Sequence, residues 1–410
     1  MKIVWEKTSL ANLIQKVIDY RGKTPLKLGG DWEENNVGYR ALSAKNIKTG
    51  HIVSPETIRY VNQALYDKWM KDEILRGDIL ITSEAPFGEV YQWNSDEKIV
   101  LSQRLFAIRA NNRIHAHYLY YYLTTHKFQQ EMRARATGTT VIGLRQPELL
   151  KCIVYYPLDK TAQAQIASIL QCIDRKIEIN TSTNRNLEQQ AQAIFKSWFV
   201  DFEPFQDGRF VDSELGPIPE GWRVGTLKDI ALYNSEKLPA SQAKHDTYVS
   251  TENMLPNRGG IELASSVPST GCVTVFAKND VLLSNIRPYF RKIWYASSSG
   301  TCSTDVLCFR TKAEVKSEYL FCVLNNEKFF EFIMSGAKGT KMPRGDKRQM
   351  MSYRIVMPPK DILENFAGTL KPLVDHQRRN TTESRRLSTL RDTLLPKLMS
   401  GEIDVSEVEV

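Results

Sequence analysis

The stretch Thr161–Val200 constrains the fold more than any other part of the chain. It contains neither proline nor glycine, so nothing in it interrupts a helix. Its apolar residues are spaced alternately by four and three, the heptad pattern that keeps one stripe of a helix against a partner. The stretch therefore predicts one long helix. Its predicted seam consists of Ile166, Leu170, Ile173, Ile177, Asn180, Asn184, Leu187, Ala191, Ile194 and Trp198.

A second stretch with the same spacing begins at Phe366 and is the predicted partner. Its seam consists of Phe366, Leu370, Leu373, Gln377, Asn380, Ser384, Leu387, Arg391, Leu394 and Leu398. Both seams are apolar at their ends and polar in the middle, so an antiparallel pair places Asn180 and Asn184 opposite the polar residues of the second seam. Buried asparagine can fix the register of such a pair. Separate packing of each helix on a globular domain remains an alternative, as does a hydrated, unpaired centre.

The two halves of the chain also resemble each other. Segments of the first half recur in the second in the same order and at a nearly constant offset, which indicates a duplication. Each half is therefore predicted to be a globular unit followed by a long helix. The matching segments are Arg76–Thr82 with Lys278–Ser284, Ser102–Arg109 with Ser303–Arg310, Tyr118–Tyr120 with Tyr319–Phe321, Gly138–Thr140 with Gly339–Lys341, Ser43–Ile47 with Ser250–Met254, and Trp5 and Leu10 with Trp222 and Leu227.

The predicted fold class is α/β (α+β), with two pseudo-repeated globular domains separated by two long helices that pair as an antiparallel coiled coil. The runs Asp78–Thr82 and Ile99–Ile108 predict strands, because they are rich in β-branched residues. Tyr118–Arg135 and Tyr319–Met334 predict helices. The predicted boundaries are 1–155 for the first domain, 161–202 for the central helix, 203–216 for a linker, 217–359 for the second domain, 361–400 for the second helix and 401–410 for a loosely held acidic tail.

Composition narrows the class of protein. A chain of 410 residues is long enough for two or three domains. Its apolar runs are shorter than a membrane span, and its start lacks the apolar core of a signal peptide, so we expect no membrane association and a cytoplasmic location. The six cysteines form no CxxC pair and are expected to be reduced thiols. A net charge of +8 favours a polyanionic partner.

The known catalytic motifs predict no active site. Gly22–Thr24 ends like a phosphate-binding loop, but Val17 occupies the position of that loop's first glycine. The only Pro-Pro pair, Pro358–Pro359, lacks the flanking residues of an amino-methyltransferase loop. The histidines His115, His117 and His126 lack cysteines or carboxylates at ligand spacing. We therefore expect no catalytic residues, no metal site and no cofactor in this chain.

Two basic loops are the strongest candidates for contact with nucleic acid. Basic loop 1 (Arg133–Arg145) and basic loop 2 (Ser335–Arg348) follow the predicted helices at equivalent places in the two halves. Basic side chains, hydroxyls and backbone amides suit phosphate contacts. One such loop alone is adequately explained as solvated surface, but its presence in both halves favours DNA. With base-reading candidates placed after strands, the predicted DNA-binding residues are Lys45, Asn46, Ser83, Arg135, Thr139, Thr140, Arg145, Asn253, Asn285, Arg287, Tyr289, Arg291, Lys338, Thr340, Lys341, Arg344 and Lys347.

Four further motifs are distinctive: Asp19–Pro25, Gln192–Phe202, Leu215–Trp222 and Leu394–Ile403. With the duplication and the paired helices, they make the chain resemble, over essentially its whole length, the specificity subunit of type I restriction–modification enzymes. The resemblance implies two target recognition domains for double-stranded DNA, each recognising one half of a split sequence. It also implies helices that act as a ruler and dock two methyltransferase subunits, which restriction (translocase–nuclease) subunits then join.

In that family the specificity subunit itself catalyses nothing, so the resemblance implies that S-adenosylmethionine, Mg and ATP are bound by the partner subunits. The recognition domains of the family diverge strongly, so the resemblance assigns no base-reading residue. Two other classes of function stay open on the sequence. One is a coiled-coil scaffold that binds proteins, and the other is a divergent single-chain DNA methyltransferase or nuclease.

Overall fold

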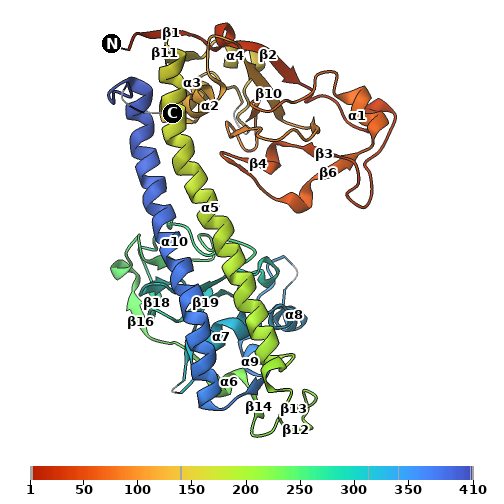
Figure 1. The fold of residues 1–410 in the computed structure, drawn as a ribbon, viewed down its shortest axis with the longest axis vertical. Coiled ribbons are helices and arrows are strands. Elements are labelled where there is room, and N and C mark those ends of the chain that lie inside the picture. The colour runs from red at the N-terminus through yellow and green to blue at the C-terminus, as the bar shows by residue number, and fades with distance from the viewer. Residues whose placement is uncertain (1–2, 139–140, 313, 340, 407, 409–410) are drawn as a thin grey trace. The chain divides into compact units, whose positions relative to one another are not determined.

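The computed structural model describes residues 3–138, 141–312, 314–339, 341–406 and 408. The chain divides into two compact units. Unit 1 comprises Met1–Glu178 and Ser384–Val410, and unit 2 comprises Ile179–Glu383. The division passes through two long helices, α5 (Lys160–Phe199) and α10 (Lys360–Ser400), so each unit contains a part of both helices. In Figure 1, α5 is yellow-green and α10 is blue.

Unit 1 is a mixed α/β domain. Its described strands are β1 (Trp5–Ser9), β2 (Ile14–Asp19), β3 (Tyr39–Leu42), β4 (Ile47–Lys48), β5 (His51–Ile52), β6 (Arg59–Val61), β7 (Ile79–Thr82), β8 (Val90–Gln92), β9 (Ile99–Leu101), β10 (Leu105–Ala110) and β11 (Ile153–Pro157). Its helices are α1 (Gln63–Trp69), α2 (Ala116–Thr124), α3 (His126–Ala134) and α4 (Gln146–Leu150), with 3₁₀ turns η1 (Leu10–Leu13), η2 (Leu26–Leu28), η3 (Ala44–Asn46) and η4 (Pro55–Thr57).

The main sheet of unit 1 is antiparallel, in the order β2-β10-β7-β8. All four residues of β7 are buried, as expected for an apolar strand between two neighbours. A smaller sheet has the order β6-β3-β9, in which β3 and β9 are parallel, and β1 pairs with β11. One hydrophobic core joins residues of the main sheet and of α2 to Ile166 and Leu170 of α5. The helix is thus part of the domain's core.

Unit 2 has the same plan. Its described strands are β12 (Phe210–Val211), β13 (Ile218–Pro219), β14 (Arg223–Thr226), β15 (Ala231–Tyr233), β16 (Lys237–Pro239), β17 (Tyr248–Val249), β18 (Cys272–Phe276), β19 (Val281–Ser284), β20 (Ile293–Tyr295), β21 (Gly300–Cys302), β22 (Val306–Thr311) and β23 (Arg354–Met357). Its helices are α6 (Leu227–Ile230), α7 (Ser317–Leu324), α8 (Glu327–Ser335) and α9 (Lys347–Met351), with 3₁₀ turns η5 (Glu203–Phe205), η6 (Ala240–Gln242) and η7 (Pro288–Phe290).

The order of strands confirms the duplication. The main sheet of unit 2, β15-β22-β19-β20, matches β2-β10-β7-β8, and the pair β14-β23 matches β1-β11. The parallel pair β17-β21 likewise matches β3-β9. The core of unit 2 extends onto α5 and α10 through Phe195, Phe199 and Phe366. The ring centroids of Phe199 and Phe366 lie 4.7 Å apart.

The two long helices pair antiparallel, and the predicted polar centre is formed by direct hydrogen bonds. In unit 2, Asn380 Nδ2 donates to Asn184 Oδ1 over 2.9 Å, and Gln377 Nε2 donates to the Asn184 carbonyl oxygen over 2.9 Å. Asn180 Nδ2 donates to Glu383 Oε2 over 2.8 Å. In unit 1, Asp174 of α5 pairs with Arg391 of α10 over 2.8 Å. These contacts contradict both separate packing of the helices and a hydrated centre. Every residue of the two predicted seams is buried or partly buried.

Several local predictions were wrong. Tyr118–Arg135 is two helices, α2 and α3, because the Thr125 side chain caps the start of α3 by accepting from the Phe128 N–H. Tyr319–Met334 is likewise divided into α7 and α8, where Asn326 caps α8. The run Ile99–Ile108 is two strands in different sheets, separated by a turn at Arg104, whose φ is +62°.

The chain beyond α10 also differs from the prediction. The tail was expected to be loosely held, but Val405 is fully buried in the core of unit 1. Gln165 Nε2 of α5 donates to the Val408 carbonyl oxygen over 2.6 Å. The apolar residues of the acidic tail thus attach it to the domain. Among the described residues, none of the helices is both long enough and apolar enough to cross a membrane.

Candidate nucleic-acid interface

In unit 1, three segments meet where the predicted DNA-binding residues cluster. The Ser83 N–H, just after β7, donates to the Arg104 carbonyl oxygen over 2.9 Å. The Leu144 N–H of basic loop 1 donates to the Ser83 carbonyl oxygen over 3.0 Å. Reciprocal bonds of 2.9 Å between Thr137 and Gly143 close the loop on itself. The end of β7, the β9–β10 turn and the loop therefore form one backbone frame.

A cavity of about 830 Å³ opens beside this frame. Its lining includes four basic side chains and two acids, and the chain brings them together from segments far apart in sequence. Arg21 pairs with Asp19 over 2.6 Å, and Arg104 pairs with Glu84 over 2.9 Å, whereas Lys27 and Arg145 are exposed. The lining residues are Asp19, Arg21, Gly22, Thr24, Lys27, Ser83, Glu84, Gln103, Arg104, Thr137, Val141, Gly143, Leu144 and Arg145.

Sequence reasoning missed Arg21, Lys27 and Arg104 as members of this surface. Arg21 and Lys27 lie in and just after a motif that only the family resemblance singled out. The run Ile99–Ile108 predicts a single strand, and a single strand contains no turn that would expose Arg104. The signal that could have found Arg104 is its match to Asp305 in the duplication, because polar residues at equivalent places inside two apolar runs suggest a turn.

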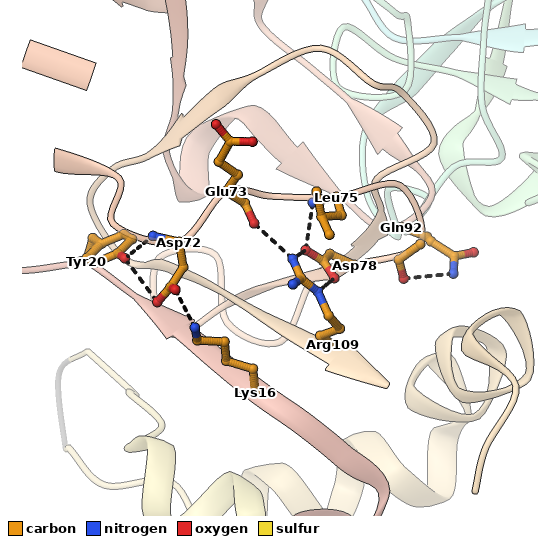
Figure 2. Close-up of polar contacts among 9 residues, drawn as sticks. Lys16, Tyr20, Asp72, Glu73, Leu75, Asp78, Gln92 and Arg109 are labelled. Carbon is orange, nitrogen blue, oxygen red and sulfur yellow. Dashed lines mark hydrogen bonds and ion pairs between the residues drawn. The ribbon is translucent and has the colours of Figure 1, made fainter. Parts of the chain in front are cut away.

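A polar network holds β2, the strand that ends two residues before Arg21 (Figure 2). Lys16 of β2 forms an ion pair with Asp72, and the Asp72 N–H donates to the Tyr20 hydroxyl over 2.8 Å. Next to it, Arg109 of β10 donates to both carboxylate oxygens of Asp78 over 2.8 and 2.7 Å. Both strands are thereby tied to the segment 72–78, which places the residues after β2 at the cavity.

Unit 2 has the same frame with its charges placed differently. The Asn285 N–H donates to the Asp305 carbonyl oxygen over 2.9 Å, and the Gly345 N–H donates to the Asn285 carbonyl oxygen over 3.3 Å. Reciprocal bonds of 3.0 and 2.9 Å between Lys338 and Arg344 close basic loop 2. Asp305 pairs with Arg344 over 3.1 Å. In unit 2 the carboxylate of this ion pair therefore lies on the turn and its guanidinium lies on basic loop 2.

Basic loop 2 presents its cations to solvent. Lys341, Lys347 and Arg348 are exposed. Asp346 accepts from the N–H groups of Arg348 and Gln349 at the start of α9. The Gln349 N–H, together with the Lys338 ammonium 3.2 Å away, holds the pKa of the Asp346 carboxyl below its usual value. This acid is therefore engaged within the protein, and the loop retains a positive surface.

The structure places part of the predicted DNA-binding set on the surface. Lys45, Arg145, Tyr289, Lys338, Lys341, Arg344 and Lys347 are exposed. Arg135 and Arg291 are partly exposed but are paired with carboxylates, Arg135 with Glu131 and Arg291 with Glu327. Thr139, Thr140 and Thr340 lie outside the described residues.

Four predicted base-reading residues are buried, and we withdraw them as DNA contacts. Asn46 Oδ1 accepts from the Ser43 N–H and hydroxyl, and its Nδ2 donates to the Thr57 hydroxyl and the Ser54 carbonyl oxygen. Asn253 makes the equivalent bonds to Ser250 and donates to the carbonyl oxygens of Tyr248 and Glu262. The four buried residues are Asn46, Asn253, Ser83 and Asn285.

Arg287, another predicted DNA-binding residue, is partly buried. Its Nε is buried without a hydrogen-bond partner in the described part of the chain. Its backbone N–H is bound to the Pro343 carbonyl oxygen of basic loop 2 over 2.8 Å. The residue therefore helps to join the segment after β19 to basic loop 2.

The histidines offer no assembled metal site. Among the described residues, no group of three or more His, Cys, Asp or Glu side chains is arranged to hold a metal ion. The rings of His115 and His117 lie 5.5 Å apart, and burial lowers the pKa of both imidazoles. His117 bonds to Gln92 and the His115 N–H donates to Gln163 of α5, so both residues act in packing.

Comparison with known proteins places these surfaces in context. The model of the type I restriction modification DNA specificity domain matches twice, over residues 3–189 and 219–387. The chain is 26% identical to the type I restriction enzyme MjaIX specificity subunit of Methanocaldococcus jannaschii, over 81% of this chain and 79% of that protein. It is 22% identical to the type I restriction enzyme HindI specificity subunit of Haemophilus influenzae, over 81% of this chain and 88% of that protein.

A solved structure shares the fold. The type I restriction–modification system S subunit from M. genitalium aligns with a TM-score of 0.57 at 16% sequence identity, covering 97% of this chain and 96% of that one. The similarity extends along nearly the whole of both chains, so it includes both globular units and the long helices.

Proposed function

The chain belongs to the type I restriction modification DNA specificity family, and from this premise we propose that it is the DNA-recognition subunit of a type I restriction–modification complex. Unit 1 binds one half of a bipartite duplex sequence, and unit 2 binds the other. The observation that carries the proposal is the repeated backbone frame. In both units it joins the end of a central strand, a turn and a basic loop, and in both it presents cations suited to phosphates.

We further propose that α5 and α10 set the distance between the half-sites and dock two methyltransferase subunits, which restriction subunits join. The catalytic groups, S-adenosylmethionine, Mg and ATP belong to those partners in this proposal. The polar centre around Asn184 and Asn380 supports a spacer role, because direct amide bonds across the pair favour one register.

The decisive experiment expresses the full chain with methyltransferase subunits in a host without other methylation and maps every methylated base by sequencing. The expected result is a split motif, two short specified sequences separated by a fixed unspecified gap. The variant K27A/R145A should reduce methylation of weakly matching sites whichever half carries the mismatch, because phosphate contacts contribute equally for every sequence. Methylation without any common motif, or by the chain without partners, would contradict the proposal.

The spacer role has its own test. One heptad is inserted between Glu178 and Ile179 and another between Glu383 and Ser384, where the division between units crosses the helices. Seven residues lengthen a helix by about 10.5 Å, which corresponds to roughly three base pairs at 3.4 Å each. The mapped gap should grow accordingly while both half-sites stay the same. Insertion into α5 alone is the control and should abolish methylation, because the seams then fall out of register.

A further inference from the structure

Unit 2 carries an exposed aromatic turn between its basic loop and α8. The turn is η7 (Pro288–Phe290), in which Tyr289 is 47% exposed and Phe290 is 37% exposed. Their ring centroids lie 4.6 Å apart. Two exposed methionines belong to the adjoining segments, Met334 in α8 and Met342 in basic loop 2. Large apolar side chains left together on a surface usually mark a contact with a partner.

The aromatic turn is held rigidly. Arg287 and Arg291, which flank it, both have left-handed backbone conformations with φ of +50° and +51°, an arrangement that non-glycine residues keep only where their surroundings enforce it. Hydrogen bonds on both sides of the turn hold this backbone conformation. The Arg287 N–H is bound to Pro343 on one side, and the Phe290 carbonyl oxygen accepts from the Asn257 N–H over 2.8 Å on the other. A rigid turn loses little conformational entropy when it binds.

The arginines near the turn are occupied in supporting it. Glu327 of α8 forms ion pairs with both Arg291 and Arg258. Arg258 also donates to the Asn325 carbonyl oxygen over 3.2 and 3.1 Å, and the Asn325 side chain donates to Glu188 of α5 over 3.0 Å. These residues form a continuous network that extends from the turn to α5. Within the network, Arg258, Arg291 and Glu327 are positioning residues for the rings.

The surroundings of the turn identify duplex DNA as its partner. Exposed Lys338 and Lys341 lie in the loop to which the turn is bonded. Lys292, which follows the turn, places its ammonium 5.9 Å from the Phe290 ring centroid. Lys338 is paired with Asp346 over 3.2 Å and Lys292 donates to the Thr251 carbonyl oxygen over 2.6 Å, but Lys341 adds further positive charge to the exposed loop. A phosphate backbone is a better counterpart to this basic surface than an apolar protein partner. The apolar rings then face the groove between two phosphate strands.

We propose that Tyr289 and Phe290 contact the edges of base pairs in the duplex bound by unit 2, and that their apolar target is the methyl group of a thymine. More than half of each residue is covered by the protein, so only a part of each ring is available for contact with the groove. In the major groove the thymine methyl is the apolar feature of a base pair. This inference rests on the proposed function and adds a recognition mode to it.

The first test maps methylation with the Y289A/F290A variant of the full chain in its complex. The expected motif loses its preference at one A·T pair in one half-site and keeps every other position. The matched control is Leu215, which is 45% exposed in the turn between β12 and β13; L215A should leave the motif unchanged. An unchanged motif for Y289A/F290A overturns the inference, and so does a motif whose two half-sites both relax.

The second test uses the mapped duplex with single thymines replaced by deoxyuridine, which lacks only the methyl group. The unaltered complex should bind about fourfold more weakly when one thymine of the relaxed half-site is replaced, the value of one buried methyl group. The Y289A/F290A complex should bind both duplexes equally. If no replacement weakens binding by the unaltered complex, the inference is overturned. If that complex still binds its mapped sequence specifically, the proposed function stands. Loss of all sequence preference in the unaltered complex would instead refute the proposed function itself.

The positioning role is tested with E327Q, which removes the charge that holds both arginines. The expected result is weaker preference at the same A·T pair and no other, because the rings remain present but are held less firmly. The salt dependence of binding should not change. A variant that alters salt dependence without altering that preference would show that Arg258 and Arg291 contact phosphates, and would overturn their assignment as positioning residues.

Discussion

The two basic loops share a backbone frame and differ in how they place charge. In unit 1 the frame's ion pair joins Glu84, after β7, to Arg104 on the turn, and basic loop 1 takes no part in it. In unit 2 the pair joins Asp305 on the turn to Arg344 of basic loop 2. The backbone bonds through Ser83 and Asn285 are the same. The comparison teaches that the duplicated scaffold preserves main-chain geometry, while the charged side chains that it carries differ between the two units.

The largest expected effect concerns the buried ion pair that both scaffolds contain. Asp78 pairs with Arg109, and Asp280 pairs with Arg310, each over 2.7 Å. Removing one partner of a fully buried pair costs about 3–5 kcal/mol. The arginine side chains are 23% and 33% exposed, so solvent screening lowers this cost. We expect D78A to lower the free energy of unfolding by about 2–3 kcal/mol, and D280A to lower it by less.

Urea unfolding of D78A and D280A measures the two losses in free energy of unfolding and shows which is larger. The control is D96A, which removes a fully exposed pair with Arg76 and should change stability little. A D280A variant that is less stable than D78A would break the comparison, because it would show that exposure of the guanidinium does not control the cost.

The next effect concerns the two buried asparagines that we withdrew from the DNA surface. N46A and N253A should each lower the free energy of unfolding by roughly 2 kcal/mol, since each leaves buried N–H and carbonyl groups without a partner. Both should leave the salt dependence of DNA binding unaltered. Normal stability with a loss of binding to the mapped duplex would reinstate the asparagines as DNA contacts.

A smaller effect separates the two cationic surfaces. Each phosphate contact contributes about 0.9 to the slope of log K against log salt concentration. K341A/K347A in unit 2 should reduce the slope for a random-sequence duplex by nearly 2. K27A/R145A in unit 1 should reduce it less, because Asp19 and Glu84 line the same cavity. Fluorescence anisotropy over a salt series measures both slopes, and equal reductions would remove the distinction between the two surfaces.

The smallest effect compares two carboxylates of α5. Asp174 in unit 1 has Arg391 at 2.8 Å, whereas Glu188 in unit 2 accepts from the neutral Asn325 amide. Burial raises the pKa of the Glu188 carboxyl. In the unfolded chain Glu188 ionises at its ordinary pKa, so at any pH above that range its ionisation favours the unfolded state, and at more acidic pH this cost is absent.

E188Q should therefore be slightly more stable than the unaltered chain at neutral pH, and the gain should disappear as the pH falls below the ordinary glutamate range. D174N should instead be less stable at neutral pH, because Arg391 then keeps only its ion pair with the exposed Asp392. Thermal unfolding at a series of pH values checks both. A gain from E188Q that persists at acid pH would point to better packing as its cause.

The sequence predicted those parts of the fold that depend on repeated local patterns. The seam from Ile166 to Trp198 is visible because each residue follows from helical periodicity, and the duplication is visible because segments such as Arg76–Thr82 recur in order. The breaks at Thr125 and Asn326 were missed because one capping residue within an apolar run leaves the average pattern unchanged. The turn at Arg104 was missed for the same reason.

The candidate surface was less predictable, because it depends on what folding brings together. Asn46 and Asn253 looked like base-reading residues, since the sequence does not reveal that turn carbonyls and hydroxyls satisfy their amides. Arg21 and Arg104 are far apart in the chain and meet only through the frame around Ser83. Exposed lysines such as Lys341 were easier to predict, because a glycine-rich basic segment has few ways to become buried.

The polar centre of the helix pair also limits how the chain can misfold. Heptad seams are periodic, so a pair shifted by seven residues still keeps the two seams facing each other. Such a slip toward the start of α10 would set Asn184 against Leu370 in place of Gln377 and Asn380, leaving several buried amides unbonded at about 1–3 kcal/mol each. The amides thus act as a check on alignment, and they reject a pairing error that the apolar residues alone would tolerate.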